Sequence, residues 1–115
     1  MTLGENGEDL ACDELVRRGY AIVARRFRVR GGELDIVARD GPVLVFVEVK
    51  TRSGNRFGAA AEAVTGAKQR RLVRLAGEYL VRHRLSDCHC RFDVVSVTVG
   101  AGAPVVEIIR NAFDA

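Results

Sequence analysis

The sequence predicts a mixed α/β domain, in which helices pack against a central sheet that contains both parallel and antiparallel strands. Two stretches, residues 5–18 and about 60–84, repeat apolar residues at helical spacing. Apolar or alternating segments of strand length lie between and after them. A strand–helix–strand connection requires at least one parallel strand pair. The predicted order is α-β-β-β-α-β-β, in a single domain over residues 1–115.

The first helix, residues 5–18, carries an apolar stripe of Ala11, Cys12 and Leu15 and ends before Gly19. Glu8 lies one turn earlier on the same face. Two interpretations of Glu8 are open. It lies near the helix start, where water reaches it and an acid is favourable, or it is aimed at a functional site.

The next segments predict three strands, and Asp35 lies in the second of them. Residues 20–29 begin with Tyr20, Ile22 and Val23, which we expect to be buried, and residues 43–47 are continuously apolar. The intervening 39–42, Arg-Asp-Gly-Pro, has the composition of a tight hairpin turn.

The length of that turn decides where Asp35 lies. With a two- or four-residue loop, Asp35 lies opposite Glu48 or Phe46 and shares a face with them. A three-residue loop would send Asp35 to the other face. We expect the even loop.

Glu48 and Lys50 end the most apolar strand and point the same way, because strand side chains alternate between faces. With an even loop, Asp35 converges on them, and Glu33 lies on the same side. The alternative is an ordinary surface ion pair at a strand end, which contributes little.

Carboxylates held this close repel, and in a low-dielectric site one of them tends to protonate. A divalent cation removes that conflict, and oxygen ligands favour Mg²⁺ or Mn²⁺. Such a metal polarises a phosphodiester, generates hydroxide and orients its attack. We expect nearby carboxylates to raise the pKa of Lys50 above its usual value of about 10.4. Lys50 would then act as a cation that holds the attacking water and stabilises charge on the phosphate.

The polar loop 51–58 follows this strand and brings Arg52 and Arg56 beside the predicted metal. In the helix at about 60–84, Lys68 lies on the apolar side. It either extends its ammonium to water along that surface or points over the sheet toward a phosphate. Residues 91–99 and 104–110 predict two more strands.

Composition limits the protein class. The 115 residues are 48% hydrophobic, enough for one core, and the net charge of +3 with a pI near 9.1 is compatible with a polyanionic partner. We expect no signal peptide and no membrane span. Three cysteines, an odd number, favour a reducing, cytoplasmic compartment. Cys88-His89-Cys90 matches no common zinc motif.

The order of elements and the acidic motif resemble the PD-(D/E)XK superfamily, in which an Asp precedes a strand bearing E-x-K, as Asp35 precedes Glu48-Val49-Lys50. More specifically, the chain resembles the small bacterial YraN-like family of predicted endonucleases. The matching segments are Gly4-x-x-Gly7-Glu8-x-x-Ala11, Gly19-Tyr20, Gly32-Glu33-Leu34-Asp35-Ile36, Phe46-Val47-Glu48-Val49-Lys50-Thr51-Arg52, Lys68, Arg91-Phe92-Asp93-Val94-Val95 and Asn111-Ala112-Phe113.

This resemblance implies a restriction-endonuclease-like fold. It also implies similarity to archaeal Holliday-junction resolvases, which place a helix glutamate near the metal, and Glu8 is the matching position. One departure is visible, because the family often has Arg-Asn where this chain has Arg25-Arg26.

The leading hypothesis is a metal-dependent nuclease of DNA, selective for branched or junction structure rather than for sequence. Asp35, Glu48 and Glu8 would bind Mg²⁺ or Mn²⁺, with Lys50 positioning the nucleophile. The backbone would be held by Arg52, Arg56 and Lys68. A homodimer would suit two-fold junctions, and no organic cofactor or membrane is expected. The alternatives are a catalytically silent nucleic-acid-binding module with the same fold and an interaction protein with ordinary ion pairs.

Overall fold

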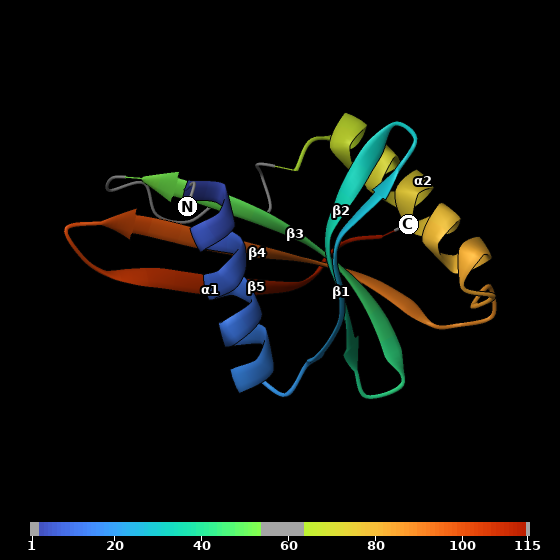
Figure 1. The fold of residues 1–115 in the computed structure, drawn as a ribbon, viewed down its shortest axis with the longest axis horizontal. Coiled ribbons are helices and arrows are strands. Elements are labelled where there is room, and N and C mark those ends of the chain that lie inside the picture. The colour runs from blue at the N-terminus through green and yellow to red at the C-terminus, as the bar shows by residue number, and fades with distance from the viewer. Residues whose placement is uncertain (1–2, 54–63, 115) are drawn as a thin grey trace.

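The computed structural model describes residues 3–53 and 64–114, with side chains from residue 6 onward. Two helices and five strands follow one another as predicted (Figure 1). Their bounds are α1 Leu3–Arg17, β1 Ala21–Val29, β2 Gly32–Asp40, β3 Val43–Ser53, α2 Gly66–Arg82, β4 Cys90–Gly100 and β5 Gly102–Phe113.

The five strands form one sheet in the order β1-β2-β3-β4-β5. Only the β3–β4 pair is parallel, and α2 lies between these two strands in the sequence. The other three pairs are antiparallel. This mixed α/β architecture confirms the predicted element order and is consistent with a restriction-endonuclease-like fold.

The helices cover opposite faces of the sheet, and strand alternation divides the core between them. Val45 and Val47 of β3 face α1 and pack in one cluster with Leu15. Leu44 and Phe46 face α2 and belong to a second cluster. Because β3 is buried on both faces, its sequence is a continuous apolar run rather than an alternating one.

The β2–β3 turn contains two residues, Gly41 and Pro42, because Asp40 pairs with Val43. Gly41 has a φ of 59°, which glycine adopts without strain. The even loop is therefore confirmed. The described register reaches Ile36 opposite Val47, and Asp35 and Glu48 are the next residues of the two strands.

The β1–β2 hairpin bends at Arg26, a non-glycine residue with a φ of 53°. Ala24 and Phe27 are three residues apart, yet both pack into the α2-side cluster, so the usual alternation breaks between them. Beyond the bend the hairpin lies beside α2 (Figure 1). There the Phe27 ring packs edge-on against Tyr79 at 4.9 Å between centroids.

Helix α2 begins at Gly66, later than the predicted start near residue 60. Thr65 has extended backbone angles, and its side-chain oxygen accepts a hydrogen bond from the Lys68 amide, so Thr65 is the N-cap. Residues 60–63 lie outside the described part of the chain. The helix ends at Arg82, where His83 caps it.

Both edge strands are irregular. The β1 pairing shifts register between Ile22 and Ala24, and β5 shifts twice against β4. Asn111 in β5 has a φ of 52°, and its amide donates to Asp93 Oδ1 at 2.9 Å. Neither α1 nor α2 has the length and apolar run that a bilayer crossing requires.

Candidate functional site

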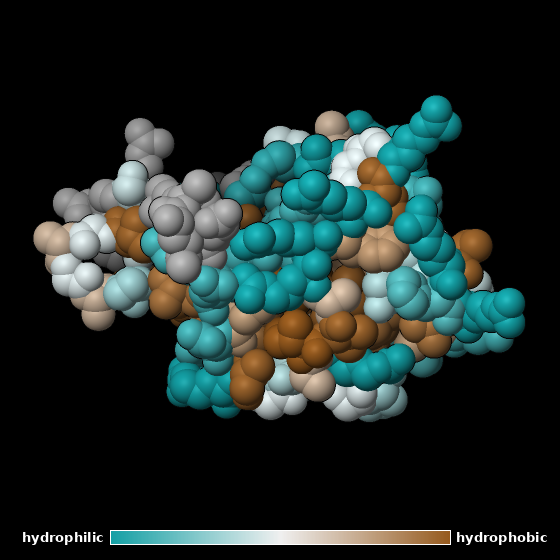
Figure 2. Space-filling view, in the orientation of Figure 1, coloured by the Kyte–Doolittle hydropathy of each residue, from teal (hydrophilic) through white to brown (hydrophobic). Residues whose placement is uncertain are grey.

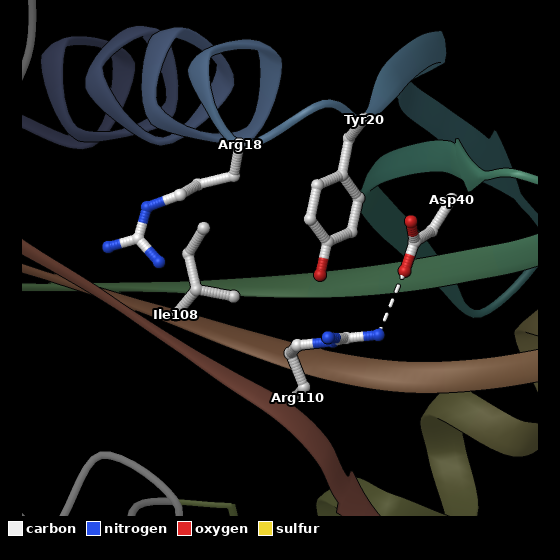
Figure 3. Close-up of a pocket in the computed structure, with 5 residues that line it drawn as sticks. All are labelled: Arg18, Tyr20, Asp40, Ile108 and Arg110. Atoms are coloured by element: carbon white, nitrogen blue, oxygen red, sulfur yellow. Dashed lines mark hydrogen bonds and ion pairs between the residues drawn. The ribbon is translucent and has the colours of Figure 1, made fainter.

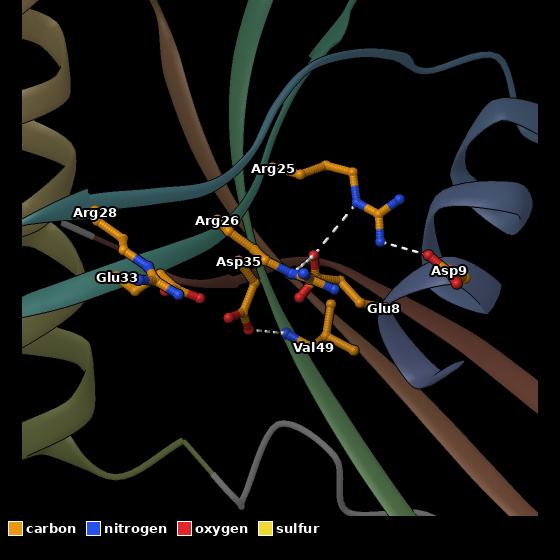
Figure 4. A network of polar contacts seen from close by, with 8 residues as sticks. All are labelled: Glu8, Asp9, Arg25, Arg26, Arg28, Glu33, Asp35 and Val49. Atoms are coloured by element: carbon orange, nitrogen blue, oxygen red, sulfur yellow. Dashed lines mark hydrogen bonds and ion pairs between the residues drawn. The ribbon is translucent and has the colours of Figure 1, made fainter. Parts of the chain in front are cut away.

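Asp35, which is partly buried, and Glu48, which is buried, form a carboxylate pair where β2 separates from β3. Glu48 is 9% exposed. Asp35 Oδ2 accepts a hydrogen bond from the Val49 amide at 2.9 Å (Figure 4). Burial, and next the charge of Glu48, raise the pKa of Asp35 to about 7. Burial also raises the pKa of Glu48, although Lys50, Lys68 and Arg71 oppose the shift.

The backbone explains this placement. Pairing of β2 with β3 is described only as far as Ile36–Val47, and the bend opposite, at Arg26, turns the hairpin away toward α2. The Val49 amide lies past the end of that pairing and donates to the Asp35 carboxylate instead of to a backbone carbonyl. A buried donor must be satisfied, so the Asp35 side chain is held against β3 beside Glu48.

The only two lysines of the chain meet at this pair. Lys50 Nζ lies 3.9 Å from Glu48 Oε1, and Lys50 contacts Lys68. Burial, followed by the Lys68 contact, lowers the pKa of Lys50. The expected upward shift is therefore wrong in direction, because desolvation and a second ammonium outweigh the attraction of the carboxylates. Lys68 is partly buried, contacts Lys50 and acts through its charge on Glu48, so its side chain lies by the carboxylate pair.

Glu8 is buried on α1, but its carboxylate is bound to arginines. Glu8 Oε1 accepts from Arg25 Nε at 3.3 Å and from Arg26 Nε at 3.1 Å (Figure 4). Arg25 also binds Asp9 at 2.6 Å. The charge of Glu8 contributes to the raised pKa of Asp35. Among the described residues, no three His, Cys, Asp or Glu side chains gather closely enough to hold a metal ion.

The remaining predicted residues lie around the carboxylate pair, outside the described part of the chain or in the hairpin. Arg52 lies two residues after Lys50 in β3, is partly buried and has an interaction partner. Arg56 lies outside the described residues. Glu33 pairs with Arg28 at 2.9 Å within the hairpin. Sequence reasoning missed Arg71, whose charge acts on Glu48; its position three residues after Lys68 was the available signal.

The N-terminal part of α1 also contacts β3 beside the site. A side chain at Gly7 would overlap the Thr51 hydroxyl, so only glycine allows this approach. Thr51 directly follows Lys50. The helix that carries Glu8 is thereby held against the strand that carries Glu48 and Lys50.

A second polar cluster lies on the α1 side of the sheet, around Asp93, which pairs with Val47 of β3. Asp93 has a buried side chain that accepts from the Tyr20 hydroxyl at 2.7 Å and from Arg91 Nε at 2.9 Å. Arg91 and Arg110 both bind Asp40. Burial and the Asp93 bond raise the pKa of Tyr20 to about 12.

A pocket of about 150 Å³ opens beside this cluster (Figure 3). Its arginines already have acidic partners: Arg18 binds Glu14 and Arg110 binds Asp40. We therefore assign this cluster a structural role, because its charges compensate one another.

Comparison with known proteins shows the family. The model of Uncharacterised protein family UPF0102 matches residues 7–97. A UPF0102 protein of Symbiobacterium thermophilum is 54% identical over 114 residues, covering 98% of this chain and 97% of the relative.

Two further relatives are similar over nearly their whole length. A UPF0102 protein of Geobacter metallireducens is 49% identical, covering 98% of this chain and 93% of the relative. One of Frankia alni is 53% identical, covering 96% and 93%. The expected YraN-like family is confirmed: the chain belongs to Uncharacterised protein family UPF0102.

Proposed function

We propose that this protein is a metal-dependent nuclease that hydrolyses phosphodiester bonds in DNA. The observation that carries the proposal is the desolvated pair of the partly buried Asp35 and the buried Glu48, which lies with Lys50 and Lys68 toward the end of β3. An acidic pair with raised pKa values beside cations is typical of a site adapted to chemistry rather than to stability.

The donor set fits Mg²⁺ or Mn²⁺. Burial raises the pKa of both carboxylates, and the charge of Glu48 raises that of Asp35 further; a hard cation would relieve this cost of ionisation. Mg²⁺ is commonly bound through one or two carboxylates, with water and substrate phosphate at its other positions. Asp35 and Glu48 would hold the ion, and Glu8 would join them only after releasing Arg25 and Arg26. When bound, the metal supplies an acidified water and polarises the phosphate.

The cations have separable roles in this proposal. Lys50, 3.9 Å from Glu48, would orient the attacking water and stabilise charge that develops on the phosphate. Lys68, which contacts Lys50, would hold a phosphate oxygen of the substrate, and Arg52 and Arg56 would hold the neighbouring backbone. Contacts to phosphate carry no base information, so we expect selectivity for branched structure rather than for sequence.

A second candidate function is nucleic-acid binding without catalysis. The pairing of Glu8 with two arginines favours it, because this removes one of the three predicted ligands from the site. A silent binder would bind DNA with strong salt dependence and would bind no Mn²⁺ through Asp35.

The test is a cleavage panel of duplex, single-stranded, flapped and four-way DNA with Mg²⁺ or Mn²⁺. We expect wild-type cleavage of a branched substrate and a loss of about 10²–10³-fold in Asp35→Asn, because the ion would lose a ligand. Asp13→Asn is the matched control, because Asp13 is exposed on α1. Its rate should stay within about twofold of the wild type.

Calorimetric titration with Mn²⁺ separates the two candidates. The nuclease requires wild-type binding that Asp35→Asn weakens and Asp13→Asn retains. Cleavage that survives Asp35→Asn, or Mn²⁺ binding unaffected by it, would contradict the proposed site.

A further inference from the structure

The cations of this protein differ between the two sides of the sheet. On the α1 side, arginines of α1, β1, β4 and β5 are in ion pairs; they are Arg17, Arg18, Arg25, Arg26, Arg91 and Arg110. On α2, just after it, and on the hairpin beside it, another set forms no ion pair with any described acidic residue. This set is Arg30, Arg39, Lys68, Arg70, Arg71, Arg74, Arg82 and Arg84.

Part of this second set forms a row along α2. Lys68, Arg71 and Arg74 are spaced by three residues, which places them on one helix face. The charge of Arg71 acts on Glu48 at one end of the row. The guanidinium of Arg74 lies next to Gly31 in the β1–β2 turn. Further along, Arg82 lies over the Phe27 ring, 5.5 Å from its centroid.

The row is continuous with the candidate site and exposed to solvent. Arg71, Arg74 and Arg82 are exposed, and Figure 2 shows mostly hydrophilic side chains over the β1–β2 hairpin and α2. The first turn of α2 contains no acidic residue, although acids are favourable there. The local sequence therefore gives up a stabilising charge and keeps this end of the helix positive.

We propose that Arg71, Arg74 and Arg82 of α2, with the β1–β2 turn, form the surface on which a nucleic-acid backbone lies as it leaves the Asp35–Glu48 site. This inference rests on the proposed function and adds the path of the substrate to it. From Lys68 to Arg82 the helix rises about 21 Å. That length corresponds to about six nucleotides of one strand at roughly 3.4 Å each.

The observations favour nucleic acid over an anionic membrane. A membrane-surface helix presents apolar side chains beside its basic ones. Here the apolar side of α2 is buried against the sheet through Leu72, Leu75 and Tyr79. Val81 is the only large hydrophobic residue of α2 that is strongly exposed.

The experiment compares two double variants with the same change in net charge. Arg71→Gln/Arg74→Gln removes two cations of the row, and Arg17→Gln/Arg18→Gln removes two from α1. Binding to flapped and duplex DNA is measured by fluorescence anisotropy in EDTA, where cleavage is excluded, between 50 and 200 mM KCl.

We expect the row variant to bind at least about tenfold more weakly at low salt. Its slope of log K against log salt should fall by about 2, because each lost phosphate contact removes about 0.9. The α1 variant should keep the wild-type slope and stay within about threefold in affinity. Equal weakening of both variants would overturn the proposal, since net charge alone would explain it.

Measurements of cleavage and of vesicle binding separate this proposal from the proposed nuclease activity and from membrane binding. Cleavage with unchanged binding in the row variant would leave the nuclease standing and overturn the docking surface. DNA binding that depends on the row, without cleavage of any substrate, would support the docking surface and overturn the proposed nuclease. Loss of binding to phosphatidylglycerol vesicles in the row variant, with DNA binding unchanged, would also overturn the proposal.

Discussion

The two faces of the sheet use the same residue type for different purposes. On the α1 face, Arg91 is enclosed by Asp93, Asp40 and the Tyr20 hydroxyl, so its charge is compensated within the protein. On the α2 face, Arg71 and Arg74 have no acidic partner among the described residues. The paired charges of the α1 face hold elements of the fold together, whereas the unpaired charges of the α2 face leave a positive electrostatic field that can attract a partner molecule.

The same difference separates stability from activity. The buried polar groups around Asp93 on the α1 face are satisfied within the protein, so removing one should leave others unpaired and destabilise the protein. Near Glu48, by contrast, the charge of Glu48 raises the pKa of Asp35, and Lys50 faces a second ammonium. Removing one of those should relieve the folded state and stop the proposed reaction. The following predictions test that separation.

The largest expected effect is on activity. Lys50→Gln should lower the cleavage rate by about 10²–10³-fold, because a cation beside the attacked phosphate is lost. Its melting temperature should equal or exceed that of the wild type, since Lys50 is destabilised by burial and by Lys68. Cleavage rate and calorimetric melting are measured on the same samples. A large fall in both would make Lys50 a structural residue.

The counterpart on the α1 face is Asp93→Ala. It leaves Arg91 and the Tyr20 hydroxyl partly unpaired in a buried site, and we expect a loss of about 3–5 kcal/mol in the free energy of unfolding. Urea denaturation measures this loss. DNA binding at temperatures where the variant is folded should not change.

A double variant controls for the unpaired charge. Arg91→Met/Asp93→Ala removes both members of the pair and should recover part of the stability lost in Asp93→Ala. If the double variant loses as much free energy of unfolding as Arg91→Met and Asp93→Ala lose separately when added together, the two residues do not stabilise the protein as a pair.

The third prediction concerns pH. The folded-state pKa of Asp35, about 7, lies above the usual 3.8. The folded protein therefore holds this proton more tightly than the unfolded chain does. Stability from this group is fully present below about pH 4 and is lost as the pH rises to about 7, by at most about 4 kcal/mol in EDTA.

Asp35→Asn should remove that slope. In EDTA the variant should gain stability relative to the wild type at pH 8, and much less at pH 5. Mg²⁺ at pH 8 should stabilise the wild type and leave the variant unchanged. Parallel stability–pH curves of the two proteins in urea denaturation would show that Asp35 is not the titrating group.

The smallest effects come from two glycines, one in each helix. Gly7→Ala places a methyl group against Thr51 and should cost about 1–3 kcal/mol. Gly77→Ala in α2 meets nothing within 4 Å and should stabilise the protein by about 0.5–1 kcal/mol. Thermal denaturation compares them. Equal effects would indicate that α1 is not packed closely on β3.

Much of the site could be predicted because it depends on local geometry. The composition of residues 39–42 predicted a tight hairpin turn, and the expected even loop puts Asp35 on the same face as Glu48. Alternation along β3 then placed Glu48 and Lys50 on one face. The late start of α2 was also present in the sequence, as Thr65 before Gly66, but the alanine-rich segment preceding it has strong helix propensity.

The rest depended on contacts between distant segments. Glu8 binds arginines 17 and 18 residues away, which no helical periodicity reveals. The direction of the Lys50 pKa follows from burial, and burial is set by how the hairpin and α2 close over the sheet. Val23, expected to be buried, is 46% exposed, because the register shift in β1 turns it outward.

The irregular outer strands have a consequence for solubility. An unpaired strand edge offers its free amides and carbonyls to other chains and promotes fibre formation. Here one edge is interrupted by a register shift and by the left-handed Arg26, and the other by two shifts, Pro104 and the left-handed Asn111. A neighbouring molecule cannot extend a regular ladder along either edge, so these breaks protect the protein from stacking edge to edge.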